Sequence, residues 1–279
     1  MPTIKTALTE AFSLLQSVNE SPLLDAEVLL CKVLGKDRSY LRAWPDGELS
    51  PEQNQAYQVL VNARRQGKPI AYITGTREFW SRDFLVSPDV LIPRPDTELL
   101  IELSLVLIPT NQPCRIIDLG TGSGIIAITL AAERPDAQVI ATDISPAAIQ
   151  IAKTNAAKHN VGHIEFYQSN WFDSIPAGKF DLIVSNPPYL AEDDEHLQQG
   201  DLRFEPKTAL IANEEGLVDI RIIAETAITK LESGGYVIVE HGYDQGLTIR
   251  KMFISLGYNN VQTHEDLARL PRVTVGQNV

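Results

Sequence analysis

Hydrophobic residues in the first part of the chain recur three and four positions apart, which is the spacing of a helix that buries one face. The segments Ser21–Gly35 and Ser50–Gly67 each begin with a serine and a proline and end at a glycine, as helices commonly do. Gln53 stands where it would complete a capping box with Ser50. Together with a third helical segment, Ile4–Val18, the pattern predicts a small helical bundle over residues 1–75.

The pattern changes beyond this bundle. From Arg77 to Val90, aromatic and β-branched residues around Ser87-Pro88-Asp89 predict a short β-hairpin, and we expect residues 76–95 to link two domains. Two prolines then fix the backbone of the segment Ile92–Glu98, which leads into the next helix. Arg94 and Glu98 either line a substrate cleft or pin this junction by an ion pair, and the sequence leaves both roles open.

The remaining residues, 96–279, alternate between short apolar strands and helices. Such alternation predicts an α/β domain with a mostly parallel sheet covered on both faces, whose ligands bind beyond the carboxyl ends of the strands. The expected strands are 115–119, 138–143, 164–168, 182–185 and 236–240, with a closing pair near 261–264 and 273–275; the expected helices end near residues 133, 159, 231 and 256.

Composition narrows the classes of function. The chain has 279 residues and is 44% hydrophobic, which allows one α/β domain and a smaller companion. Its apolar runs are far shorter than the roughly 20 residues that span a bilayer, and its start lacks a signal-peptide pattern, so we expect a cytoplasmic protein without membrane contact. The cysteines, Cys31 and Cys114, give neither a disulfide framework nor a metal site, and we expect buried thiols. A predicted helix end separates His159 from His163, so we expect no metal.

The formal net charge of −12 disfavours DNA or RNA as a direct substrate, because sequence-independent nucleic-acid binding requires clustered lysine and arginine. The acidic run Glu192–Glu195 is either a solvated loop or a surface that receives a basic protein partner.

A glycine-rich loop follows the first strand of the α/β region and opens a helix, where glycines let a ligand approach the backbone. Its G-x-G-x-G spacing departs from the dinucleotide fingerprint, whose third glycine would fall at Ile125, and no P-loop lysine follows. A carboxylate two residues before the first glycine repels phosphate but suits a ligand that carries an amino group and hydroxyls. We therefore predict S-adenosylmethionine as the cofactor, with the loop residues Asp118, Gly120, Thr121, Gly122, Ser123 and Gly124 as its binding site.

Two further residues at strand ends are candidate cofactor ligands. Asp143 ends the next strand, where a carboxylate can accept hydrogen bonds from ribose hydroxyls. The alternative is a cap for the helix at Pro146, although Ser145 can take that role. Trp171, just after the third strand, either flanks the adenine ring or belongs to the core.

The tetrapeptide Asn186-Pro187-Pro188-Tyr189 follows an apolar strand and should project into the same crevice as the glycine loop. The two prolines fix the backbone and supply carbonyls without competing N–H donors. The Asn186 side-chain oxygen and the Pro187 carbonyl can accept two hydrogen bonds from an NH2 group, while Tyr189 presents a flat face to a planar substrate. The alternative is a plain turn made by the prolines.

These acceptors match the chemistry of a planar amide or amino nitrogen. An amide nitrogen is a poor nucleophile because its lone pair is delocalised. Holding both of its hydrogens aims that lone pair at a methyl donor and stabilises the positive charge that grows on nitrogen. The sequence therefore predicts an N-methyltransferase with Asn186, Pro187 and Tyr189 as catalytic residues and Asn186–Tyr189 as the substrate-binding segment.

Segments on either side of these motifs narrow the class further. They are Pro69–Gly75, Glu78-Phe79, Val90–Glu98, Phe204–Pro206 and Ala209-Leu210. With them the whole chain resembles the protein-(glutamine-N5) methyltransferases of class 1 peptide chain release factors. Asp96 departs from the glutamate that many members carry, and the match at Asp266–Arg269 is weak.

The resemblance implies the Rossmann-like sheet of class I S-adenosylmethionine-dependent methyltransferases with a small N-terminal helical bundle. It implies methylation of the glutamine in the Gly-Gly-Gln motif of release factors, with the bundle helping to recognise the release factor. It also implies that Gly120–Gly124, Asp143, Trp171 and Asn186 contact the cofactor and that Asn186–Tyr189 hold the glutamine. Glu205-Pro206 is either a lid or a plain loop.

Two other functions remain as alternatives. A methyltransferase of exocyclic amines in DNA or RNA would suit the same tetrapeptide, because adenine N6 presents the same planar NH2 group, but it requires a basic groove that the net charge disfavours. A non-catalytic cofactor-binding adaptor would be favoured by an altered Asn186 or Pro187, and both residues are present.

Overall fold

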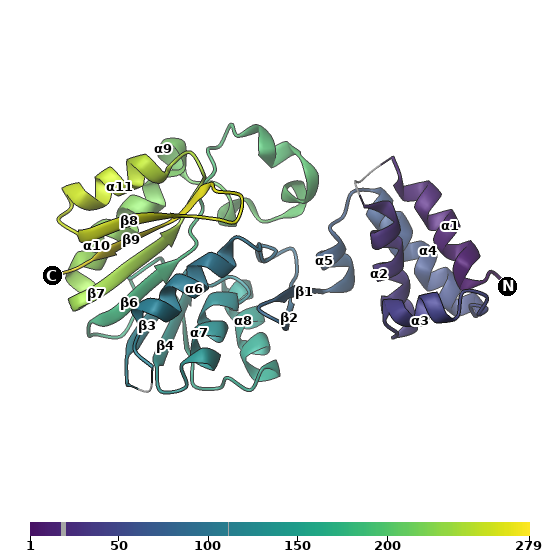
Figure 1. The fold of residues 1–279 in the computed structure, drawn as a ribbon, viewed down its shortest axis with the longest axis horizontal. Helices are drawn as coiled ribbons and strands as arrows, with labels where there is room; N and C mark the ends of the chain where they lie inside the picture. The colour runs from purple at the N-terminus through teal and green to yellow at the C-terminus, as the bar shows by residue number, and fades with distance from the viewer. Residues whose placement is uncertain (18–20, 111) are drawn as a thin grey trace. The chain divides into compact units, whose positions relative to one another are not determined.

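The computed structural model describes residues 1–17, 21–110 and 112–279. These residues divide into two compact units, drawn in Figure 1 with the chain coloured from its N-terminus to its C-terminus. The first unit comprises Met1–Thr76 and Gln198–Phe204, and the second comprises Arg77–Leu197 and Glu205–Val279.

Short helices pack around one apolar core in the first unit, as its hydrophobic spacing predicts. The predicted capping box is present, since Gln53 N donates to Ser50 Oγ (3.2 Å) and Ser50 N donates to Gln53 Oε1 (2.9 Å). The predicted segment at the N-terminus extends to Val18, a residue that lies outside the described ranges. The helices are α1 (Ile4–Leu15), α2 (Pro22–Leu34), α3 (Arg38–Ala43), α4 (Pro51–Arg65) and α5 (Ile70–Thr74).

A segment from far along the chain also belongs to the first unit. Gln198–Phe204 contains the 3-10 helix η2 (Gly200–Phe204). Arg64 anchors it, because its guanidinium contacts both Asp25 (2.7 Å) and Asp201 (3.3 Å) while its side chain is only 13% exposed. No periodic pattern in the sequence predicts this long-range contact.

A two-stranded hairpin of β1 (Thr76–Phe79) and β2 (Arg82–Leu85) precedes the large sheet in the chain. Its turn is Trp80-Ser81, and both residues have positive φ, 52° and 56°. A hairpin is thus present in the predicted region, Arg77–Val90, but its turn lies at Trp80-Ser81 and not around Ser87-Pro88-Asp89. Asparagine and glycine are the usual residues at positive φ in two-residue hairpin turns, so a Trp-Ser turn carries no recognisable signal.

The second unit is built on a mostly parallel sheet, as predicted. In the part of the chain that the structure describes, the strands lie in the order β5-β4-β3-β6-β7-β9-β8, and only β9 runs in the direction opposite to the other strands. The strands are β3 (Arg115–Leu119), β4 (Gln138–Asp143), β5 (Glu165–Gln168), β6 (Phe180–Ser185), β7 (Leu231–Glu240), β8 (Asn259–Glu265) and β9 (Pro271–Gln277). The helices are α6 (Thr97–Leu107), α7 (Ile125–Glu133), α8 (Pro146–Lys158), α9 (Asn213–Gly216), α10 (Val218–Lys230) and α11 (Gly246–Ser255), with the 3-10 turns η1 (Glu195–Gln198) and η3 (Lys207–Ala209).

Helices cover both faces of this sheet (Figure 1). The helices α6, α7 and α8 contribute to a hydrophobic cluster on one face, and α10 and α11 contribute to a second cluster on the other. Strand β3 serves both clusters, because Ile116 packs in the first while Ile117 and Leu119 pack in the second. Successive side chains of a strand point to opposite faces, so a strand covered on both sides must be apolar, and each such buried side chain contributes about 1.5–3 kcal/mol.

The strand order reverses at the centre of the sheet. From β3 the chain moves outward through β4 to β5 and then returns to place β6 on the other side of β3. Open α/β sheets bind their ligands outside the carboxyl ends of the strands at such a reversal. The glycine loop follows β3 and the Asn186–Tyr189 segment follows β6, so the topology itself puts both motifs at this position.

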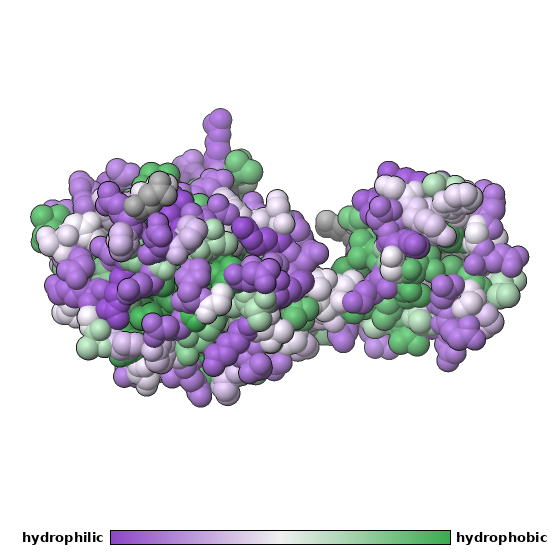
Figure 2. Space-filling view, turned by 90° about the horizontal axis from the view of Figure 1, so that it is seen from below, coloured by the Kyte–Doolittle hydropathy of each residue, from purple (hydrophilic) through white to green (hydrophobic). Residues whose placement is uncertain are grey.

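The surface gives few further constraints. None of the helices in the described residues combines the length and the hydrophobicity needed to cross a bilayer. The face of the larger unit seen in Figure 2 is mainly hydrophilic. Cys114 is buried, as expected, whereas Cys31 is only half-buried, and burial raises the pKa of both thiols.

Candidate functional site

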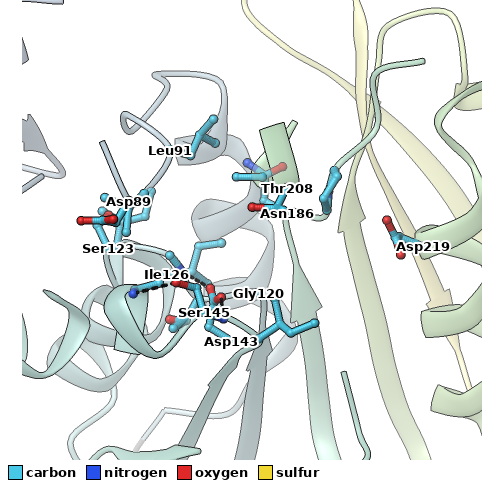
Figure 3. A pocket seen from close by; sticks show the side chains of 18 of the residues that line it. Asp89, Leu91, Gly120, Ser123, Ile126, Asp143, Ser145, Asn186, Thr208 and Asp219 are labelled. Atoms are coloured by element: carbon cyan, nitrogen blue, oxygen red, sulfur yellow. Dashed lines mark hydrogen bonds between the residues drawn. The ribbon is translucent and has the colours of Figure 1, made fainter. Parts of the chain in front are cut away.

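A cavity of about 320 Å³ lies at the carboxyl ends of β3, β4 and β6 (Figure 3). This volume is in the range of small-molecule sites. Of the predicted site residues, the cavity brings together Gly120, Thr121, Gly122, Ser123, Asp143, Trp171, Asn186 and Pro188. Asp118, Gly124, Pro187 and Tyr189 fall outside the lining that the described residues form.

The glycine loop turns sharply away from β3. Gly120, Gly122 and Gly124 all have positive φ, between 55° and 86°. At Gly124 a Cβ atom would lie 2.8 Å from Ile128 Cδ1 and 3.1 Å from Ala152 Cβ, so glycine is required there both for its φ and for close packing of α7 against α8. Gly124 therefore supports the loop without lining the cavity.

Asp118 holds the loop rather than lining the cavity. It is fully buried, and its Oδ2 accepts hydrogen bonds from Thr121 Oγ1 (2.7 Å) and Ala127 N (3.2 Å). Burial raises the pKa of Asp118 to about 7, against the opposing effect of those two hydrogen bonds. Its Oδ1 has no hydrogen-bond partner among the described residues. A contact between Asp118 and the cofactor stays a prediction.

Asp143 joins the loop to the end of β4. Its Oδ2 accepts from Gly122 N (2.9 Å) and its Oδ1 accepts from Ser145 N (2.8 Å). Ser145, not Asp143, caps α8, because Ser145 Oγ accepts from Ala148 N. The Asp143 carboxylate therefore faces the cavity with its remaining lone pairs, and burial raises its pKa despite the backbone hydrogen bonds.

Trp171 lies both at the cavity and against the core, and its contact with an adenine ring stays a prediction. Its ring lines the cavity and also packs against the second hydrophobic cluster. A Cβ atom on Gly120 would lie 3.4 Å from the ring, so the indole closes against the glycine loop. Asp219, in the first turn of α10, accepts a hydrogen bond from Trp171 and lines the cavity as well. Sequence analysis missed Asp219, because an acidic residue in a first helical turn is an ordinary feature.

The Asn186–Tyr189 segment projects from β6 beside the glycine loop. Ser185 Oγ donates to Leu119 O (2.7 Å), which ties the end of β6 to the end of β3. Asn186 Nδ2 donates to Thr97 Oγ1 (3.2 Å). Figure 3 shows Asn186 at the end of its strand, across the cavity from Gly120 and Asp143. The Tyr189 ring is half-buried against the second cluster, and its carbonyl accepts from Gln245 Nε2 (2.9 Å).

Arg94 resolves one alternative in an unexpected way. It lines the cavity and forms an ion pair, but its partner is Glu205 and not Glu98. Glu98 instead accepts a hydrogen bond from Trp80 N (3.3 Å) in the hairpin turn. Glu205 also accepts from Ile92 N (3.0 Å), and its side chain is 0% exposed. Glu205 therefore fastens the segment before α6 to the segment that carries η3.

Two loop segments form cavity walls that sequence analysis did not identify. Asp89, Val90 and Leu91 come from the segment after the hairpin, and Thr208, Ala209 and Ile211 come from the segment after Glu205. Neither has a periodic pattern, although both overlap the short motifs on which the family resemblance rests. The acidic run Glu192–Glu195 is largely exposed, and its binding role stays a hypothesis.

The cavity walls fit S-adenosylmethionine in chemical type. The Asp143 carboxylate suits ribose hydroxyls, the Trp171 indole suits an adenine ring, and the glycine loop allows close backbone contact. Behind the loop, Asp118 Oδ1 is a buried acceptor without a hydrogen-bond partner among the described residues, which suits a ligand that carries an amino group. The nearby Arg94 is neutralised by Glu205.

Comparison with known proteins finds similar methyltransferases over nearly the whole length of the chain. The PrmC N-terminal domain family matches residues 6–75, and the Methyltransferase small domain family matches residues 96–205. The Release factor glutamine methyltransferase of Escherichia coli (strain K12) is 49% identical over 270 residues, which cover 97% of both chains. That of Vibrio cholerae is 50% identical over 280 residues, which cover 99% of this chain and 96% of the relative.

Solved structures confirm the predicted fold. A methyltransferase from Pyrococcus furiosus aligns with a TM-score of 0.55 over 81% of this chain and 99% of its own, at 18% identity. The fold is that of class I methyltransferases, and S-adenosylmethionine is the methyl donor, as predicted from the glycine loop. With its full-length relatives, this chain belongs to the release factor glutamine methyltransferase family.

Proposed function

We propose that this protein methylates N5 of the glutamine in the Gly-Gly-Gln motif of class 1 peptide chain release factors, with S-adenosylmethionine as the methyl donor. The observation that carries the proposal is the meeting of two motifs in one cavity. Asn186 and Pro188 line it from the end of β6, and Gly120–Ser123 line it from the end of β3. The names of the full-length relatives supply the substrate class.

The Asn186 side chain is set up as a hydrogen-bond acceptor toward the substrate. Its Nδ2 donates to Thr97 Oγ1, so Oδ1 is the atom that it offers to an incoming amide. The Pro187 carbonyl is the second acceptor that we propose, and the following proline and the Gln245 contact to the Tyr189 carbonyl hold that backbone in place. Two fixed acceptors match the two hydrogens of a primary amide.

The residues act by positioning rather than by strong base catalysis. Bound S-adenosylmethionine supplies an electrophilic methyl group. As the new N–C bond forms and the S–C bond breaks, positive charge grows on the glutamine nitrogen, and the acceptors stabilise it. The methylated nitrogen then releases a proton to solvent, which requires little help because an N-protonated amide is very acidic. Tyr189, packed against the core, is the flat surface that we propose for the glutamine side chain.

We propose the division of labour that the sequence predicts. Residues 1–75 form the domain that recognises the release factor, residues 76–95 link it to the rest, and residues 96–279 form the methyltransferase domain. The match of separate families to residues 6–75 and 96–205 supports two parts with different tasks. Action on release factors also supports a cytoplasmic location, where translation takes place.

Methyl transfer from labelled S-adenosylmethionine tests the proposal. The purified protein is incubated with a release factor, with the same factor carrying alanine in place of the Gly-Gly-Gln glutamine, and with DNA or RNA. We expect label in the natural factor alone. Label in the alanine variant at the same level would overturn the glutamine assignment, and label in nucleic acid would favour an exocyclic-amine methyltransferase.

A further inference from the structure

A buried glutamate lies next to the tetrapeptide without a role in the function described so far. Glu240 is the last residue of β7. The register pairs Val239 of β7 with Ser185 of β6, so Glu240 is placed beside Asn186, the residue that follows β6. Glu240 is 1% exposed. Its Oε2 accepts no hydrogen bond from any residue that the structure describes. Burying a carboxyl group with an unpartnered oxygen costs free energy, so a fold that retains it has another reason to do so.

Glu240 belongs to a chain of polar side chains that ends in the cavity. The side chains of Thr97 and Asn186 lie close enough to its carboxyl group to lower its pKa by hydrogen bonding. Asn186 Nδ2 in turn donates to Thr97 Oγ1 at 3.2 Å. Thr97 comes from the start of α6, Asn186 from the end of β6 and Glu240 from the end of β7, so three elements meet at this point.

The direction of these hydrogen bonds follows from the charge of the glutamate. An ionised carboxylate only accepts, so the Thr97 hydroxyl must donate its hydrogen to Glu240. The Thr97 oxygen is then left to accept, and the Asn186 amide must turn its NH2 group toward it. The Asn186 carbonyl oxygen is thereby turned toward the substrate.

We propose that Glu240 and Thr97 are positioning residues that fix the orientation of the Asn186 amide, so that its oxygen rather than its NH2 group meets the substrate amide. This inference rests on the proposed function. An amide has nearly the same shape in its two flipped orientations, so packing alone does not select one. In the wrong orientation the NH2 of Asn186 would face the NH2 of the substrate, and one of the two acceptors would be lost.

The protonation state of Glu240 gives the proposal a specific signature. Burial raises the pKa of Glu240 to about 7, with the Thr97 and Asn186 hydrogen bonds opposing the shift; Asp96 raises it further and Arg272 lowers it. The Tyr189 hydroxyl also lies within its electrostatic reach. A protonated Glu240 can donate to Thr97, which can then donate to the Asn186 oxygen. The amide orientation, and with it the rate, is therefore lost as pH falls through about 7.

The substitution Glu240→Gln tests this directly. Glutamine has the same shape as glutamate but can donate a hydrogen bond as well as accept one, so it no longer fixes the direction of the hydrogen bonds through Thr97 to Asn186. We expect kcat at pH 8 to fall roughly fivefold to tenfold, the factor expected when a charge-assisted hydrogen bond becomes a neutral one. The dissociation constant of S-adenosylmethionine should stay within about twofold, because the cofactor-binding residues are untouched. The decline of wild-type kcat near pH 7 should disappear in the variant.

Two further variants complete the test. Glu232→Gln changes an exposed glutamate at the other end of the same strand and should match the wild type in rate and pH profile. Thr97→Val removes the middle member of the hydrogen-bond chain from Glu240 to Asn186 and should lower kcat at least as much as Glu240→Gln does. This variant keeps the inference testable if Glu240→Gln misfolds. A Glu240→Gln variant with wild-type kcat and an unchanged pH profile, or a fully active Thr97→Val variant, overturns the inference. If the wild type itself fails to label release factor, the proposed function fails instead.

Discussion

The ion pair between Arg94 and Glu205 should contribute strongly to the stability of the cavity wall. Glu205 is 5% exposed, with its side chain at 0%, and it accepts from both Arg94 and Ile92 N. The substitution Glu205→Ala would leave the Arg94 guanidinium and the Ile92 N–H without their acceptor. Removing one partner of a buried ion pair costs about 3–5 kcal/mol, and an unpartnered buried donor costs about 1–3 kcal/mol.

These two losses are not additive, and the Arg94 side chain is 28% exposed, so water replaces part of what is lost. We therefore expect a net destabilisation of about 3 kcal/mol, which for a domain of this size lowers Tm by roughly 6–12 °C. Glu205→Gln keeps an acceptor for Ile92 N and should lose about half as much. Cofactor affinity should fall as well, because Arg94, Thr208 and Ala209 line the cavity.

Thermal unfolding and calorimetric titration with S-adenosylmethionine measure both effects. The matched control is Arg221→Ala, which breaks an ion pair with Glu214 whose side chains are 44% and 52% exposed. Exposed pairs contribute under about 1 kcal/mol, so this variant should unfold near the wild-type temperature. A Glu205→Ala variant as stable as Arg221→Ala would refute the reasoning that burial makes the Arg94 pair important.

Three other predictions follow from the glycine loop and its neighbours. Asp143→Ala should weaken S-adenosylmethionine binding at least about tenfold, because it removes the proposed ribose acceptor and leaves Gly122 N without its hydrogen-bond acceptor. Unchanged affinity by calorimetry would contradict the ribose role. Gly124→Ala should destabilise the protein by more than about 1 kcal/mol, through strain at φ 86° and the contact of the new Cβ with Ile128. The loss should exceed that of Gly257→Ala, where φ is 94° but no atom of the described residues lies within 4 Å of the new Cβ, and equal unfolding temperatures for the two variants would contradict this. Burial raises the pKa of Asp118 in the folded state from 3.8 to about 7, so the folded state binds the proton more tightly than the unfolded state. The stability of the wild type should therefore rise relative to that of Asp118→Asn as pH falls from about 8 to 5. A difference in Tm that does not change with pH would argue against the raised pKa.

The sheet was largely predictable because its strands carry strong signals. The ranges 115–119 and 138–143 agree with β3 and β4 residue for residue. Each is a largely apolar run with a clear end, which is Gly120 after the first strand and Asp143 before a helix start for the second. The ends of those strands carry the glycine loop and Asp143, so that half of the site was placed as well. The position of Asn186 could be predicted in the same way, because it directly follows the apolar run that forms β6.

The rest of the cavity lay beyond sequence reasoning because it depends on long-range packing. Asp219 and Glu240 look like any acidic residue at a helix start or a strand end until the fold buries Glu240 and turns Asp219 toward Trp171. The partner of Arg94 lies more than a hundred positions away, in a segment without periodicity, so the sequence could not identify Glu205 and left the roles of Arg94 and Glu98 open. Local patterns do not encode such distances.

The measurement that tests the central claim most directly is methyl transfer by Asn186→Ala under saturating S-adenosylmethionine. The release factor is digested after incubation, and the Gly-Gly-Gln peptide is analysed by mass spectrometry, with cofactor affinity measured on the same preparation. If Asn186 and the glycine loop act on one substrate in one cavity, the variant binds the cofactor within a few-fold of wild type but leaves the glutamine unmethylated. A variant that methylates this glutamine at the wild-type rate would contradict the account.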